Sequence, residues 1–98
     1  MANLLEKQKE EQKVKPPIMW NVVFHNDDFT TFEFVIACLM YFFNKNAEQA
    51  FVLTKQVHEA GKAIIGTYPK DLAETKKELA LDFAKEQEHP LNITLEQA

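Results

Sequence analysis

Three short polar residues stand in a row at positions 26–28, between a segment rich in aromatic and β-branched residues and an apolar segment of helical spacing. They are Asn26, Asp27 and Asp28, and their amide and carboxylate oxygens accept hydrogen bonds. Two carboxylates beside an amide suit a cation. The commoner role of Asn and Asp at such a junction is a turn held by bonds to nearby backbone. The residues at this junction leave both interpretations open.

His58 is the second candidate for chemistry, because it follows Thr54 by one helical turn near the end of a predicted helix. It is either a half-exposed surface histidine or a residue that faces Asn26 and Asp27 across the packing of helix and strand. The spacing of these residues matches no strong metal motif, so we predict no metal and no cofactor. The side chains eligible as metal ligands are His25, Asp27, Asp28 and His58.

The composition favours a binding module over an enzyme or a nucleic-acid-binding protein. The 98 residues contain no nucleophile motif and no Gly-rich phosphate loop, and they leave little room for a closed active site. A net charge of −4 without a basic run argues against nucleic acid. The lone cysteine, Cys38, lies in an apolar helical pattern and predicts a buried thiol. With no apolar run of membrane-spanning length, we expect a cytoplasmic protein without membrane association.

Six elements must position these residues. Residues 1–17 read as a flexible arm that ends at Pro16-Pro17, and residues 18–98 read as one domain. The order β-α-α-β-α-β predicts an α+β domain with helices on one side of a three-stranded antiparallel sheet. The predicted ranges are a strand at 18–25, helices at 31–43 and 47–60, a strand at 62–67, a helix at 70–88 and a strand at 91–96.

Local signals set the ends of these helices. Gly61 predicts the end of the second helix, because glycine readily adopts the left-handed conformation found there. Two pairs fit a capping box at a helix start, namely Thr30 with Glu33 and Asn46 with Gln49. In the helix at 70–88 we expect an inward face made of alanines together with Leu72, Leu79 and Phe83.

The ClpS adaptor family has an opening motif that resembles Asn26-Asp27-Asp28-Phe29-Thr30 with Glu33-Phe34-Val35 after it. Its second motif is similar to Val57-His58-Glu59-Ala60-Gly61-Lys62-Ala63. Further landmarks resemble Lys15-Pro16-Pro17, Ala73-Glu74-Thr75-Lys76 and Glu88-His89-Pro90-Leu91. The resemblance covers about residues 14–98, with the motifs in family order and at family spacing.

The resemblance implies an N-end rule adaptor, which breaks no bond itself. Such adaptors bind proteins whose first residue is Leu, Phe, Tyr or Trp, and they deliver them to ClpA, the AAA+ unfoldase of the ClpAP protease. The implied fold is similar to the C-terminal domain of the ribosomal stalk protein, and we expect a monomer. On the residues alone, a stalk-like scaffold domain without a peptide pocket and a small metal-dependent hydrolase also remain open.

The resemblance also implies roles for individual residues. Family members commonly carry Met near two positions that are Phe32 and Thr54 in this chain. The α-amino group and first peptide units of the degron would bind Asn26, Asp27 and His58. The side-chain pocket would be lined by Asp28, Thr30, Phe32, Val35, Thr54, Val57 and Leu91. The N-domain of the unfoldase would contact Asp71 and Lys76, and it is the arm that the unfoldase would engage during delivery.

Overall fold

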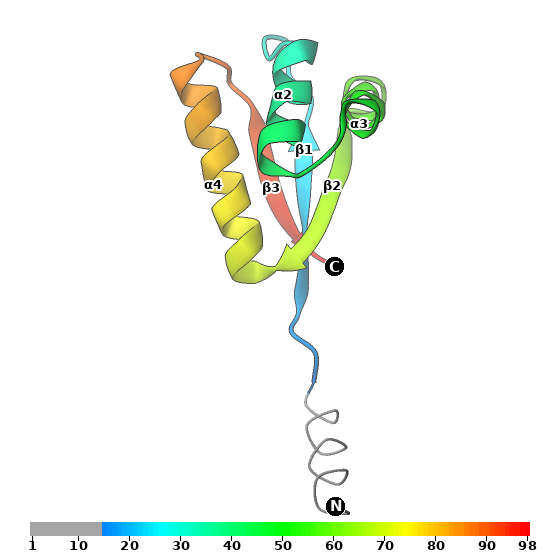
Figure 1. Ribbon diagram of the computed structural model, residues 1–98, viewed down its shortest axis with the longest axis vertical. Helices are drawn as coiled ribbons and strands as arrows, with labels where there is room; N and C mark the ends of the chain where they lie inside the picture. Colours follow the sequence, from blue (N-terminus) through cyan, green and yellow to red (C-terminus); the bar gives the residue numbers. More distant parts are fainter. Residues whose placement is uncertain (1–14) are drawn as a thin grey trace, which may run out of the picture.

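The computed structural model describes residues 15–98, so residues 1–14 of the predicted arm lie outside the described residues. The described part of the chain confirms the predicted element order, β-α-α-β-α-β (Figure 1). The strands are β1 (Met19–His25), β2 (Lys62–Pro69) and β3 (Asn92–Gln97). The helices are α2 (Phe32–Phe42), α3 (Ala47–Ala60) and α4 (Lys70–Glu86).

The sheet has the order β2-β1-β3, and both pairings are antiparallel. Its central strand β1 is rich in β-branched and aromatic residues, which suit a buried strand. In that strand Phe24 pairs with Ala63 on one side and with Ile93 on the other. Figure 1 shows α2 between α3 and α4, with α3 beside β2 and α4 beside β3.

The core lies between the sheet and the helices. Phe24 is fully buried, and its ring meets that of Phe43 edge to face, with the centroids 5.4 Å apart. Cys38 is also fully buried, which confirms the predicted buried thiol. Burial raises the pKa of this thiol to about 12, since the charged thiolate is disfavoured away from water. Cys38 is therefore an inert core residue rather than a nucleophile.

The starts of α2 and α3 test the two predicted capping boxes. At α3 the prediction is confirmed, because Asn46 and Gln49 bond reciprocally at 2.8 and 3.1 Å. At α2 the cap is Thr31 rather than Thr30, and the Thr31 hydroxyl accepts from the Phe34 amide at 3.2 Å. The Thr30 amide is already bonded to the preceding turn, which delays the helix start by one residue.

The inward face of α4 differs from the prediction. Leu72 and Leu79 are 45% and 49% exposed, so their predicted burial is wrong. The alanines are buried as predicted, at Ala73, Ala80 and Ala84. Small side chains allow the backbone of a helix to lie close to a sheet, and the larger leucines are left on the flank. Among residues 15–98, no helix is long and apolar enough to cross a membrane.

Candidate functional site

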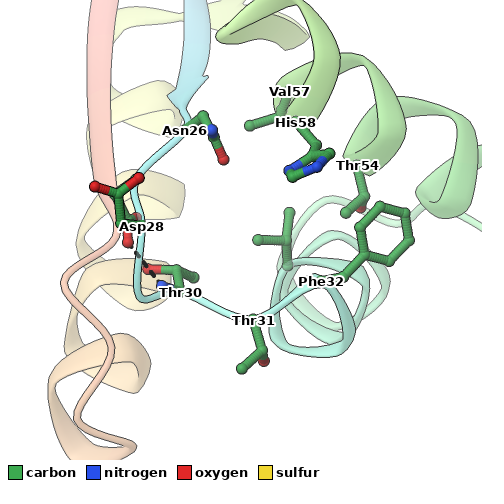
Figure 2. Close-up of a pocket in the computed structure, with 10 residues that line it drawn as sticks. Asn26, Asp28, Thr30, Thr31, Phe32, Thr54, Val57 and His58 are labelled. Carbon is green, nitrogen blue, oxygen red and sulfur yellow. Dashed lines mark hydrogen bonds between the residues drawn. The ribbon is translucent and has the colours of Figure 1, made fainter.

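A cavity of about 420 Å³ opens between the β1–α2 turn, the first turn of α2 and the second half of α3 (Figure 2). Its volume lies within the range of natural small-ligand sites. The cavity brings together nine of the residues that the sequence had placed in one site, and it adds Thr31. The lining residues are Asn26, Asp27, Asp28, Thr30, Thr31, Phe32, Val35, Thr54, Val57 and His58.

The polar wall of the cavity is a turn, as the simpler sequence interpretation predicted. The Asp27 carboxylate oxygen Oδ1 accepts hydrogen bonds from the amides of Phe29 and Thr30, at 2.8 and 2.7 Å. The main-chain N–H of Asn26 donates to the carbonyl of Gly61 at 2.9 Å. That second bond ties the turn to the end of α3. The turn therefore forms one wall of the cavity.

The Asp27 carboxyl is held in its charged form. Burial alone would raise its pKa, but hydrogen bonds from Thr30 and Phe29 and the electrostatic effect of His89 outweigh burial and lower it. Its second oxygen, Oδ2, and the Thr30 hydroxyl are buried without a well-aligned hydrogen bond in the described structure. We attribute the lowered pKa mainly to the two amide bonds, whose geometry is good.

The opposite wall of the cavity is α3. Val57 is 3% exposed, and Thr54 is 2% exposed with its hydroxyl donating to the Ala50 carbonyl at 2.7 Å. That bond satisfies the hydroxyl proton of Thr54 within its own helix. Figure 2 shows the side-chain amide of Asn26 and the ring of His58 directed into the same open space, one from the end of β1 and one from α3. The mouth of the cavity therefore carries acceptor groups from two elements.

The lining of the cavity differs from the sequence assignment at two residues. Leu91 does not line this cavity, because the chain after His89 turns it into the core, where it is 7% exposed and borders a separate cavity of about 370 Å³ beside the end of α4. Thr31 was missed, because Glu33 three residues beyond Thr30 favoured Thr30 as the cap. A usable signal was present, because an Asp in a turn commonly accepts hydrogen bonds from the amides two and three residues later. Asp27 does so with Phe29 and Thr30, and Thr31 is then the first residue available to cap the helix.

The two residues assigned to the unfoldase contact lie on α4, away from the cavity. Asp71 is exposed in the first turn of that helix. Lys76 is half-buried, and its ammonium donates to the Phe42 carbonyl at 2.8 Å. The same ammonium lies 5.8 Å from the ring centroid of Phe43 and 5.3 Å from that of Tyr68. Lys76 therefore joins α4 to the end of α2.

The candidate metal ligands do not form a metal site in residues 15–98. The structure of these residues contains no group of three or more His, Cys, Asp or Glu side chains placed to hold an ion. His25 instead shares a hydrogen bond of 2.7 Å with the Thr94 hydroxyl on the neighbouring strand. The cavity combines polar and acidic side chains with the apolar residues Phe32, Val35 and Val57, a combination that suits a small cationic group attached to an apolar one.

Comparisons with known proteins agree with this class of site. Residues 15–94 match the family described as ATP-dependent Clp protease adaptor protein ClpS. The adapter protein ClpS of Vibrio atlanticus is 51% identical over 96 residues, which cover 98% of this chain and 89% of that protein. The corresponding protein of Herminiimonas arsenicoxydans is 46% identical over 89 residues, which cover 91% and 87%.

A solved structure is similar as well. It is that of Agrobacterium tumefaciens ClpS2 bound to L-phenylalaninamide, with a TM-score of 0.82 and 32% identity, and the match covers 85% of this chain and all of that one. These matches define the class of protein as an adaptor of a Clp protease. The chain belongs to the ClpS family of ATP-dependent Clp protease adaptor proteins.

Proposed function

We propose that this adaptor recognises the N-terminal residue of substrate proteins and delivers them to a ClpA-type AAA+ unfoldase for degradation by ClpAP. The cavity takes a free α-amino group at its mouth and a Leu, Phe, Tyr or Trp side chain inside. One observation carries the proposal, namely hydrogen-bonding side chains from two elements that face a cavity partly lined by the apolar residues Phe32, Val35 and Val57. The ligand of the similar Agrobacterium protein, L-phenylalaninamide, has a free amino group beside a large apolar side chain.

The α-amino group is the feature that separates a protein N-terminus from an internal residue. In this proposal the side-chain oxygen of Asn26 and a ring nitrogen of His58, both in the cavity lining, accept hydrogen bonds from the α-amino group. Hydrogen bonds to a charged group contribute about 1.5–3 kcal/mol each. Asp27 adds a negative charge beside them and holds the turn through the Phe29 and Thr30 amides. Direct contact between Asp27 and the ammonium stays a prediction.

The first side chain of the substrate enters the apolar part of the cavity. Val35 and Val57 are buried there, and Phe32 and Thr54 complete the wall. Burying a Leu or Phe side chain contributes about 1.5–3 kcal/mol. After the costs of association, the sum is compatible with micromolar binding, since about −8 kcal/mol corresponds to 1 μM. A charged first side chain is disfavoured, because its desolvation is not repaid.

Delivery uses a different part of the molecule in this proposal. Asp71 is exposed at the start of α4 and is available to the N-domain of the unfoldase. Lys76 lies on the same helix and is assigned to the same contact with the unfoldase. Its ammonium also donates a hydrogen bond to the Phe42 carbonyl. We further assign residues 1–17 as the arm that the unfoldase engages, and we propose a monomeric adaptor that acts in the cytoplasm.

The proposal is tested by fluorescence anisotropy with a peptide that begins with Leu and carries its label at the C-terminus. We expect saturable binding of the free peptide and none of the N-acetylated one, because acetylation removes the charge and blocks the amino group. Equal binding of both peptides would exclude recognition of the amino group. No binding of either peptide by the folded protein would leave the scaffold interpretation in its place.

A further inference from the structure

An aromatic pair stands at the edge of the cavity. Phe32 is the first residue of α2 and lines the cavity, whereas Phe51 lies on α3 and is not among the lining residues. Their ring centroids are 5.6 Å apart, and the rings are inclined at 66° to each other. Aromatic pairs in this edge-to-face range are favourable beyond the area that they bury. The pair joins the two helices beside the cavity.

Phe51 has little part in the core. It is 51% exposed, while the packing stripe of α3 is made of Ala50 and Val57, which are 0% and 3% exposed. The other exposed apolar residue next to it on α3 is Val52, which is 58% exposed and lines a different cavity. The contact of Phe51 with Phe32 links it to the candidate site.

The partner of Phe51 is a residue whose ring orientation matters for binding. Phe32 follows the cap residue Thr31 directly, so its backbone is fixed by the helix start. Its ring can adopt a few rotamers about two side-chain bonds, and contact with Phe51 favours one of them. Beside it, Thr54 has its hydroxyl proton bonded to Ala50 and offers no competing donor. The wall near Phe32 is thus an aromatic surface held in place from outside.

We propose that Phe51 is a positioning residue that sets the specificity of the cavity for aromatic first residues over Leu. Held by Phe51, the Phe32 ring is presented in one orientation and contacts the ring of an N-terminal Phe, Tyr or Trp. Aliphatic Leu gains burial from the same wall but no contact between rings. This inference rests on the proposed recognition of N-terminal residues, and it adds a ranking within the class of first residues.

The test compares Kd values for free peptides that begin with Phe and with Leu, in the full chain and in three variants. In Phe51→Ala we expect the preference for Phe over Leu to fall by roughly threefold to tenfold, the span expected for one aromatic contact. The loss should fall on the Phe peptide, with the Leu peptide changed by less than about twofold. Phe51→Tyr keeps the ring and should keep the preference, whereas Phe51→Leu keeps apolar bulk and should lose it.

The matched control is Val52→Ala, which truncates the neighbouring exposed residue of α3 and should leave the preference unchanged. An unchanged preference in folded Phe51→Ala would overturn the inference. Equal weakening of both peptides would also overturn it, because Phe51 would then act on the whole cavity. Failure of the unsubstituted chain to bind either free peptide would overturn the proposed function itself and the inference with it. Preserved far-ultraviolet circular dichroism shows that each variant folds.

Discussion

The two walls of the cavity are built in different ways. The turn wall is held by backbone bonds, with Asp27 accepting two amides and Asn26 donating to Gly61. The helix wall is the regular surface of α3, where Thr54 and His58 stand one turn apart. Substitution of Asp27 on the turn wall removes the bonds that fix the backbone of the site. Substitution on the helix wall changes only the side chain that meets the ligand.

This difference suggests a division of roles between the walls. An ammonium group requires acceptors aimed at one point, and a turn fixed by its own hydrogen bonds supplies such geometry. A first side chain requires a surface of suitable shape, which a helix offers through side chains that are exchanged independently. We therefore expect variants of the turn wall to affect stability and amino-group recognition together. Apart from His58, which we assign to the amino group, variants of the helix wall should mainly alter which first residues bind.

The largest expected effect is on amino-group recognition from both walls. We expect Asn26→Ala and His58→Ala each to weaken binding of a free Leu peptide between about tenfold and a hundredfold, from loss of one bond to a charged group. Because both side chains would contact one ammonium, the double variant should lose less than the sum of the two. Anisotropy titrations of the four proteins measure this coupling. Strict additivity would show that the walls bind separate groups.

A second effect concerns the stability of the turn wall. Asp27→Ala removes the acceptor of two amides, and we expect the free energy of unfolding to fall by about 1–2 kcal/mol. Urea denaturation measures this loss. The matched substitution Glu33→Ala, in the first turn of α2, should cost less than about 0.5 kcal/mol, because it touches no bond of the turn. Equal costs would mean that the carboxylate does not hold the turn.

The same residue gives this stability a pH dependence. Folding lowers the pKa of Asp27, so its contribution is fully present above the pKa of the unfolded chain and is lost as the pH falls through the lower folded-state value. Denaturation of the unsubstituted chain and of Asp27→Asn should therefore differ most near neutral pH. The difference should shrink below about pH 4. A difference that grows on acidification would reverse the assigned direction.

A smaller effect is expected where the walls meet. Gly61 ends α3 at a φ of 88°, and its carbonyl accepts from the Asn26 amide. Gly61→Ala places a side chain in the left-handed region and should lower the free energy of unfolding by about 1–2 kcal/mol, at the lower end because nothing lies within 4 Å of the added Cβ. Gly61→Asn should cost less, since Asn tolerates this conformation. Thermal unfolding of both variants measures the difference.

The smallest effect belongs to the helix wall. Thr54→Val exchanges a hydroxyl bonded within α3 for a methyl group, and we expect the free energy of unfolding to change by less than about 1 kcal/mol. Binding of the Leu peptide should change by less than about threefold, because the Thr54 hydroxyl is already engaged by the Ala50 carbonyl. Anisotropy checks the binding. A large loss would show that the hydroxyl, and not the wall, meets the ligand.

Much of the fold was predictable because its signals are local. The bounds of α3 match the predicted range 47–60, since a capping box marks its start and Gly61 its end. Most of the site was predictable for the same reason, because Asn26, Asp27 and His58 lie in two short motifs. Their meeting across the cavity was not predictable from spacing. Their meeting depends on the bond from the main-chain N–H of Asn26 to the Gly61 carbonyl, which joins distant parts of the sequence.

The errors share one physical cause, which is that they depend on distances between elements. Leu72 and Leu79 are strongly hydrophobic, so the sequence predicts their burial together with the alanines of α4. The structure buries the alanines but leaves these two leucines about half exposed, because α4 lies close to the sheet. Leu91 was likewise assigned to the cavity from its motif, while its side chain is buried in the core and borders the space at the end of α4. No pattern within one segment contains this information.

The antiparallel register of β1 and β2 has a further consequence. His25, just before the cavity turn, pairs with Lys62, whereas Met19 pairs with Pro69, where α4 begins. The seven residues of β1 therefore separate the cavity from the start of α4 by roughly 20 Å, at opposite ends of the sheet (Figure 1). A molecule held at one end leaves the other end open to a second. In the proposed function, β1 would then act as a spacer that keeps the substrate and the unfoldase at a high effective concentration without contact between them.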